Sequence, residues 1–178
     1  AGGIGACVDP ELAGGGATWD DLDGLRRAWD GPLVVKGVLG VEDALEAVRR
    51  GADAVYVSNH GGRQLDGSPA TLDVLPEIAE AVGDRVELLL DGGVRRGEDA
   101  VKARALGARA VLVGRPWVHA LAAGGEAVVA RQLELLRADV DRTLALLGVP
   151  RLDDVGAGAL RPRVLAPNDR SVDTSARR

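Results

Sequence analysis

The chain of 178 residues is 46% hydrophobic and has a formal net charge of −5, from 27 acidic and 22 basic residues. This balance is typical of a soluble globular domain with one sizeable core, and it excludes a disordered chain. It also argues against a nucleic-acid-binding surface, because such surfaces gather Lys and Arg to neutralise phosphates. With three Trp, one Tyr and no Phe, the core must be built mainly from aliphatic residues, which suits alternating strands and helices.

The cysteine content and the distribution of apolar residues bear on the compartment. The single Cys7 cannot form an intramolecular disulfide, and we expect it to be a bystander rather than a nucleophile. No apolar run approaches the roughly 18 residues of a membrane helix, and no signal-peptide pattern opens the sequence. We therefore expect a cytoplasmic location.

The predicted elements alternate between strands and helices. After a glycine-rich loop over residues 1–17, Thr18 is expected to cap a short helix that runs to about Trp29. Strands are then expected at Leu33–Val35, Ala54–Val57, Val86–Leu90 and Ala110–Val113. Crossover helices are expected at about Glu42–Arg50, within Leu72–Val82, where Pro76 blurs the start, and at about Glu98–Leu106.

A long amphipathic helix follows the last predicted strand. Its apolar positions recur every three or four residues and make one face. They are Val129, Leu133, Leu136, Val140, Leu144 and Leu147. Gly148 and Pro150 are expected to end this helix, and residues 156–178 are expected to form a surface tail.

An internal repeat organises the middle of the chain. Gly37 to Val57 aligns with Gly93 to Val113 at 11 identical positions out of 21. The shared order is turn, acidic helix start, Gly-Ala stop and strand, which is the pattern of a βα repeat and predicts a parallel sheet. Two such units take 56 residues, so eight would need about 224, close to the size of a (β/α)₈ barrel. We therefore predict an α/β fold that is half of such a barrel, with an open four-stranded sheet as the alternative.

Polar and cationic groups follow every predicted strand. In a (β/α)₈ barrel the active site is built by the loops at these carboxyl ends. The segments are Lys36-Gly37, Ser58 to Arg63, Asp91 to Arg96, and Gly114-Arg115. Although the repeat keeps the scaffold, it changes these ends, which suggests that they perform different tasks.

The last two strand ends are candidates for an anion site. Their glycines let backbone N–H groups face an anion, and Arg95, Arg96 and Arg115 can bind phosphate. Barrels often bind phosphate after their last two strands. The alternative is that the glycines form tight turns and the arginines are solvated.

His60 and Arg63 are candidates for chemistry on a substrate. A neutral imidazole is the usual proton acceptor near pH 7, and an arginine can bind a carboxylate. The alternative for His60 is a structural histidine, which is the reading we adopt for His119 because no polar partner accompanies it. Lys36 ends an apolar strand, where a lysine is costly unless it meets negative charge, so a pairing carboxylate is the alternative to a binding role.

These segments together resemble the FMN-dependent 2-hydroxy-acid oxidases and dehydrogenases, which include glycolate oxidase, lactate oxidase and mandelate dehydrogenase. The resemblance runs from about Thr18 to Val155 and rests on four stretches. They are Val35-Lys36-Gly37, Ser58-Asn59-His60-Gly61-Gly62-Arg63-Gln64-Leu65-Asp66, Asp91-Gly92-Gly93-Val94-Arg95-Arg96-Gly97 and Gly114-Arg115-Pro116.

The resemblance implies a barrel that binds FMN at its mouth and oxidises an (S)-2-hydroxy acid to the 2-oxo acid. It places Lys36 near the N1 and O2 edge of the flavin, makes His60 the base and gives the substrate carboxylate to Arg63. It leaves open whether His60 takes the α-proton or the hydroxyl proton. The remaining cofactor-binding residues that it implies are Ser58, Asp91, Gly92, Gly93, Val94, Arg95, Gly114 and Arg115.

The resemblance covers only the last four βα units of that family's barrel, here residues 18–155. We therefore expect an N-terminal half-barrel, as a segment or a separate chain, and a homo-oligomer that the family resemblance suggests is a tetramer. Two alternatives stay open. One is another FMN- or phosphate-binding barrel enzyme, and the other is a non-catalytic half-barrel that needs a partner.

Overall fold

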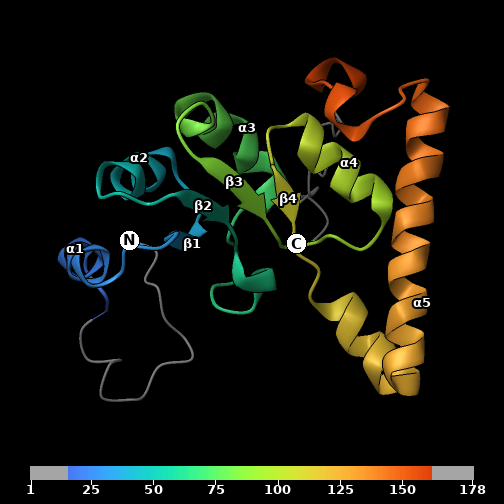
Figure 1. Ribbon diagram of the computed structural model, residues 1–178, viewed down its shortest axis with the longest axis horizontal. Coiled ribbons are helices and arrows are strands. Elements are labelled where there is room, and N and C mark those ends of the chain that lie inside the picture. The colour runs from blue at the N-terminus through green and yellow to red at the C-terminus, as the bar shows by residue number, and fades with distance from the viewer. Residues whose placement is uncertain (1–15, 162–178) are drawn as a thin grey trace, which may run out of the picture.

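The computed structural model describes residues 16–161, so Cys7, most of the predicted first loop and most of the predicted tail lie outside the described residues. Helices and strands alternate as the sequence predicts (Figure 1). The helices are α1 (Trp19–Ala28), α2 (Val41–Arg49), α3 (Thr71–Val82), α4 (Gly97–Ala105) and α5 (Arg115–Leu147), with short 3₁₀ turns η1 (His60–Gly62), η2 (Leu152–Asp154) and η3 (Ala157–Ala159). The strands are β1 (Val34–Val38), β2 (Ala54–Val57), β3 (Glu87–Leu90) and β4 (Ala110–Val111).

The four strands form one parallel sheet in the order β1-β2-β3-β4, which confirms the predicted topology. Each strand is joined to its neighbour by one crossover helix, as in a βα repeat. In Figure 1, α1 to α4 follow the strands around one side of the sheet, while α5 stands beside α4. The strand order equals the chain order, as it does in a (β/α)₈ barrel.

The two faces of the sheet have different surroundings. Val35, Val55 and Leu88 share one register position and lie in the main apolar cluster with α2 and α3. The next register position holds Lys36, Tyr56 and Leu89, whose side chains belong to the opposite face because the side-chain period is two. Within residues 16–161 no helix covers that second face, although parallel sheets are normally covered on both faces.

The ends of the elements differ from the sequence prediction at a few places. β1 continues to Val38 through a bulge at Gly37, whose φ of 97° suits glycine, whereas the prediction ended it at Val35. β4 has only two residues and pairs with β3 alone in the described part of the chain, whereas the prediction continued it to Val113. The first helix is confirmed, with Thr18 and Asp21 forming a capping box.

The last helix begins earlier than predicted and consists of two segments. It starts at Arg115 with Pro116 in its first turn, and Gly124 and Gly125 leave the helical conformation. A φ of 67° at Gly125 is one that glycine adopts without strain. Gly148 in the left-handed conformation ends the helix, as predicted.

The second segment of α5 packs on the start of α4. The Asp139 carboxylate accepts the backbone N–H of Gly97 at 2.8 Å and so caps α4 from outside that helix. A hydrogen bond from Arg142, together with those from the backbone N–H groups of Glu98 and Gly97, lowers the pKa of Asp139 below its usual value. Val140 and Leu144 join a second apolar cluster with Val101 of α4. This contact fixes α5 against the rest of the half-barrel.

Much of the apolar surface of α5 remains uncovered. Of the predicted face, Leu133 and Leu147 are exposed, while the other members are half-buried. Further apolar side chains of α5 are also exposed in the described structure: Trp117, Val118, Leu121, Val128, Leu135 and Leu146. Despite its length, neither α5 nor any other helix within residues 16–161 has the apolar stretch that crossing a membrane requires.

The contact of α4 with α5 depends on the missing side chain of Gly97. A Cβ atom there would collide with the backbone nitrogen of Val140 and would lie 2.5 Å from the carbonyl oxygen of Leu136. We predict that Gly97→Ala lowers the free energy of unfolding by about 1–3 kcal/mol, because backbone atoms cannot rotate away. Denaturant unfolding measures the change.

Gly24→Ala is the matched control for this substitution. Gly24 lies inside α1, where a Cβ would meet only the end of the Arg27 side chain at 3.9 Å. We expect it to raise stability by about 0.5–1 kcal/mol, since alanine favours the helix. Equal effects of the two substitutions would contradict the packing described.

Candidate functional site

The carboxyl ends of β2, β3 and β4 border a cleft of about 320 Å³. Its lining comes from three segments. They are His60, Gly61 and Arg63; Asp91 to Arg95; and Leu112 with Gly114 to Val118. The structure thus brings the predicted site residues into one cleft, except Lys36, Ser58 and Arg96. Lys36 and Ser58 are joined by a 2.9 Å hydrogen bond, and Lys36 contacts the cleft residue Asp91.

His60 is held over the end of β1 by an unusual backbone conformation. Its φ of 55° makes it the one non-glycine residue with positive φ in the described chain. Such a conformation costs about 1–3 kcal/mol and is commonest at functional sites. The His60 N–H donates to the hydroxyl oxygen of Ser58 at 3.1 Å, which helps to hold the turn. A Cβ on Gly37 would lie 3.0 Å from Nε2 of His60, so the imidazole needs glycine beneath it.

Lys36, Tyr56 and Asp91 form a polar cluster at the base of the cleft. The Nζ atom of Lys36 lies 3.4 Å from Oδ2 of Asp91 and 4.7 Å from the centre of the Tyr56 ring. The Tyr56 hydroxyl donates to the same Oδ2 atom at 2.9 Å. The pairing carboxylate that the sequence left as an alternative for Lys36 is therefore present, and it is Asp91. The side chain of Lys36 is still 40% exposed, so its ammonium group can also meet a ligand.

Two buried acceptors beside the cleft have no partner among the described residues. They are Oδ1 of Asp91 and Oδ1 of Asn59. A Cβ on Gly92 would lie 2.7 Å from the Asn59 oxygen and would fill the space between the segments. A buried acceptor without a donor is costly, so these atoms indicate that a hydroxyl group or water belongs there.

A few backbone N–H groups after β3 and β4 make no hydrogen bond within the described residues. Asp99 Oδ2 accepts the N–H groups of Arg95 and Arg96 at 3.0 Å each, and Asp139 takes those of Gly97 and Glu98. Within residues 16–161, no hydrogen bond occupies the N–H groups of Gly93, Val94 or Gly114. An anion in the cleft would therefore meet these donors rather than the start of α4.

The arginines near the cleft differ in their surroundings. Arg115 donates to the carbonyl oxygen of Gly61 at 3.2 Å, which ties the last strand end to the turn that carries His60. Arg63 lines the cleft, is exposed and has no hydrogen bond or ion pair within the described residues. Its guanidinium group is thus available to a negatively charged ligand.

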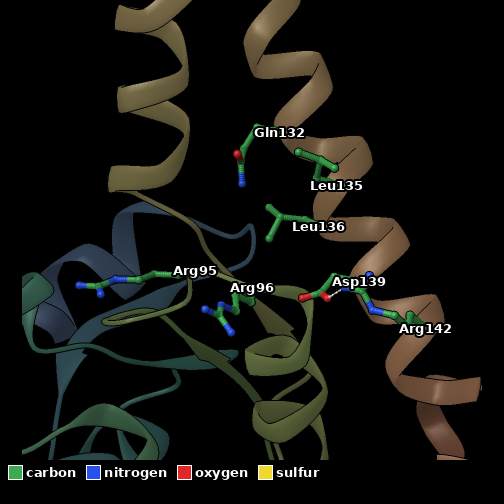
Figure 2. A pocket seen from close by; sticks show the side chains of 7 residues that line it. All are labelled: Arg95, Arg96, Gln132, Leu135, Leu136, Asp139 and Arg142. Atoms are coloured by element: carbon green, nitrogen blue, oxygen red, sulfur yellow. Dashed lines mark hydrogen bonds and ion pairs between the residues drawn. The ribbon is translucent and has the colours of Figure 1, made fainter. Parts of the chain in front are cut away.

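Arg96 does not line the cleft, whereas Arg95 lines both the cleft and a second cavity beside it. This second cavity of about 300 Å³ lies between the start of α4 and α5 (Figure 2). In this view the guanidinium groups of Arg95 and Arg96 both point away from α5, while Leu136 and Asp139 of α5 line the other side of the cavity. Arg96 also pairs with Glu98 at 3.6 Å. The part of Arg96 in the anion site stays a prediction, and its side chain lies outside the lining of the cleft.

Some residues of the site are absent from the sequence prediction. Tyr56 is one, and its signal is a single hydroxyl-bearing aromatic residue inside an otherwise aliphatic strand. Trp117 and Val118 line the cleft from α5, but only the tertiary fold brings them there. His119, predicted to be structural, is exposed on α5 and does not line the cleft.

The fold and the cleft define the class: half of a (β/α)₈ barrel with a cleft at the carboxyl ends of its strands. Residues 5–162 match the family described as FMN-dependent dehydrogenase, and the chain belongs to that family. The resemblance stated from the sequence is thereby confirmed.

The chain is similar in sequence to curated proteins that have different names. The chain is 54% identical over 138 residues to pre-mycofactocin synthase of Mycolicibacterium smegmatis, covering 78% of this chain and 35% of that protein. It is 49% identical over 163 residues to 2-hydroxyacid oxidase 1 of Mus musculus, covering 92% and 43%. It is 52% identical over 143 residues to L-lactate oxidase of Nostoc sp., covering 80% and 39%. The chain thus spans less than half the length of these curated relatives.

Solved structures agree with the half-barrel. A crystal structure of mandelate oxidase superposes with a TM-score of 0.74 at 48% identity, covering 81% of this chain and 41% of that chain. A second one, of mandelate oxidase with (S)-4-hydroxymandelic acid, gives a TM-score of 0.74 at 48% identity and covers 81% and 39%. The four βα units therefore match about two fifths of a mandelate oxidase chain.

The environment of Tyr56 leads to a prediction about its ionisation. Burial, with the hydrogen bond to Asp91, raises the pKa of Tyr56 well above its ordinary value of 10. We expect Tyr56 to stay protonated as the pH passes 10, where exposed tyrosines ionise. Because the folded pKa is the higher one, its contribution to stability is complete below about pH 10 and is lost as the pH rises further. Carbon-13 NMR of labelled tyrosine measures this, and Tyr56→Phe assigns the signal.

Asp91→Asn separates the two causes of that shift. It removes the negative charge beside the phenol but leaves the burial, so the pKa of Tyr56 should fall only part of the way toward 10. Ionisation of Tyr56 near pH 10, as for an exposed tyrosine, in the unsubstituted protein would contradict the geometry described.

Proposed function

We propose that the protein containing this chain oxidises an (S)-2-hydroxy acid to the 2-oxo acid with FMN as the electron acceptor. The observation that carries the proposal is the cleft itself, where His60 and Arg63 face the glycine and arginine segments after β3 and β4. A proton acceptor and a free cation beside an anion-binding loop suit the removal of a proton from a bound carboxylic acid. Relatives named as hydroxyacid and lactate oxidases support the same reaction.

The described residues fit FMN as the cofactor. Bound FMN would supply a two-electron acceptor for the substrate. Arg95, Arg115 and the free N–H groups of Gly93, Val94 and Gly114 would hold its phosphate. The unpartnered Oδ1 of Asp91 would accept a hydrogen bond from a ribityl hydroxyl, with Gly92 leaving the room. Ser58 would contact the flavin or its ribityl chain.

His60 and Arg63 would act on the substrate. Arg63 would bind the carboxylate through its paired N–H groups and thereby orient the α-carbon toward His60. His60 would accept the proton that leaves the substrate, from a position fixed by Ser58 and by the glycine beneath the ring. Lys36 would present a positive charge to the side of the flavin where electron density gathers.

The residues of this chain that the structure describes form only part of the site. A volume of about 320 Å³ lies at the lower end of the range for ligand pockets, and one face of the sheet has no cover within residues 16–161. Exposed Val34 on β1, Leu112 after β4 and Trp117 on α5 would lie against an N-terminal half-barrel. We infer that this half, as a segment or a separate chain, completes the cleft. A homo-oligomeric state and a cytoplasmic location stay predictions.

A second candidate is an FMN-dependent barrel enzyme with another substrate. Pre-mycofactocin synthase is as similar to this chain as the named oxidases are, so identity alone does not select the substrate. The exposed, unpaired Arg63 favours a substrate with a carboxylate. Retained FMN without reduction by any 2-hydroxy acid would favour this candidate. Normal folding with no flavin would favour a non-catalytic half-barrel.

His60→Ala tests the proposed base. In the full-length protein we expect the yellow flavin absorbance to remain, while anaerobic bleaching by a 2-hydroxy acid slows by about 10²- to 10⁴-fold. His119→Ala is the control, because His119 is exposed on α5 and lies outside the cleft. Bleaching at an unchanged rate in His60→Ala would refute the role of this residue.

Arg95 and Arg96 are neighbours in sequence, but only Arg95 lines the cleft. We predict that Arg95→Gln weakens FMN binding by about 10- to 100-fold, because it removes a charge-assisted hydrogen bond to the phosphate. Riboflavin, which has no phosphate, should bind with nearly unchanged affinity. Arg96→Gln should alter the binding of neither ligand, since Arg96 does not line the cleft. Fluorescence titration of the apoprotein measures all four affinities, and equal losses for both variants would contradict the assignment.

A further inference from the structure

Tyr56 occupies the side of β2 that faces away from the main core. Its strand neighbours Val55 and Val57 are fully buried in the main apolar cluster, to which Tyr56 does not belong. It lies in register with Lys36 on β1 and Leu89 on β3, and it is only 8% exposed. The phenol therefore projects toward the interior that the half-barrel partly encloses.

The contacts of Tyr56 are with the polar cluster of the cleft. Its hydroxyl group donates to Oδ2 of Asp91 at 2.9 Å, and its ring lies beneath the ammonium group of Lys36 at 4.7 Å. The same Oδ2 atom is 3.4 Å from Nζ of Lys36. One carboxylate oxygen thus receives both a phenol donor and an ammonium group, while Oδ1 has no partner among the described residues.

In this arrangement the Tyr56 hydroxyl and the Lys36 ammonium group share the Oδ2 atom of Asp91. Without the phenol donor, Lys36 would be the sole partner of Oδ2 among the described residues, and the ion pair would tighten. A tighter pair would draw the ammonium group down toward Asp91 and neutralise more of its charge. Hydrogen bonds to charged acceptors also fix geometry, so the carboxylate would lose its orientation together with the donor.

We propose that Tyr56 is a positioning residue of the flavin site, whose hydroxyl group orients the Asp91 carboxylate and keeps the Lys36 ammonium group available to the bound cofactor. The proposal rests on the proposed function, because it assumes that FMN occupies the cleft. It adds a residue of β2 that contacts Asp91 and Lys36 but not the proposed base. The phenol acts through Asp91 and stays protonated, since burial favours its neutral form.

The expected consequence concerns the reduced flavin. Reduction adds negative charge near Lys36, so an ammonium group that is less available stabilises the reduced form less. In Tyr56→Phe, which keeps the ring and its packing, we predict that reduced FMN binds three- to tenfold more weakly relative to oxidised FMN. This ratio corresponds to a midpoint potential lower by about 15–30 mV for two electrons.

The experiment is a spectroscopic redox titration of the full-length protein loaded with FMN. Val57→Ala is the control, since Val57 is buried on the opposite face of the same strand and should lower stability without moving the potential. Incorporation of 3-fluorotyrosine at position 56 keeps the shape, makes the phenol a stronger donor and should raise the potential. This second variant tests the proposal even if Tyr56→Phe fails to fold.

A double-mutant cycle with Asp91→Asn shows whether Tyr56 acts through Asp91. In the Asp91→Asn background, Tyr56→Phe should no longer change the potential. An independent, additive shift would overturn the proposal, and so would an unchanged potential in Tyr56→Phe with FMN bound. Neither result would affect the proposed function, which instead fails if the unsubstituted full-length protein binds no flavin.

Discussion

The arrangement of the cleft depends on the contacts of the Asp91 carboxylate with Tyr56 and Lys36. This carboxylate stands at the end of β3 and joins two neighbouring strands, because it accepts from Tyr56 of β2 and pairs with Lys36 of β1. Its own backbone carbonyl accepts the Thr71 hydroxyl at the start of α3. A charge at this place would be costly in a sheet interior, but here each charged group has a partner. The two charges therefore stay at the mouth of the sheet in a defined geometry.

The second constraint is the uncovered face of the sheet. Hydrophobic packing is complete between the strands and α2 and α3, where the core residues are fully buried. Across the sheet, the described residues supply no matching layer, and the edges at β1 and β4 carry exposed Val34 and Leu112. Edge strands and uncovered apolar faces are liabilities that proteins normally cover. The coverage of about two fifths of each relative gives the same conclusion by an independent route.

Much of this architecture could be predicted from the sequence. The repeat that begins at Gly37 and again at Gly93 predicted the parallel topology, and Thr18 correctly predicted the start of the first helix. The cavity beside Arg96 could not be predicted, because residues of α5 line it and that helix returns to α4 only later in the chain. The capping of Gly97 by Asp139 is non-local for the same reason. Tyr56 was missed because alternation along a buried strand does not say which face meets a site.

The measurement that tests the account most directly is native mass spectrometry of the full-length protein, combined with its absorbance spectrum. We predict a polypeptide that contains this chain together with a second half-barrel and holds one FMN per complete barrel. Flavin bound stoichiometrically by these 178 residues alone would contradict the need for a second half. A completed barrel that folds without any flavin would contradict the assignment of the cleft.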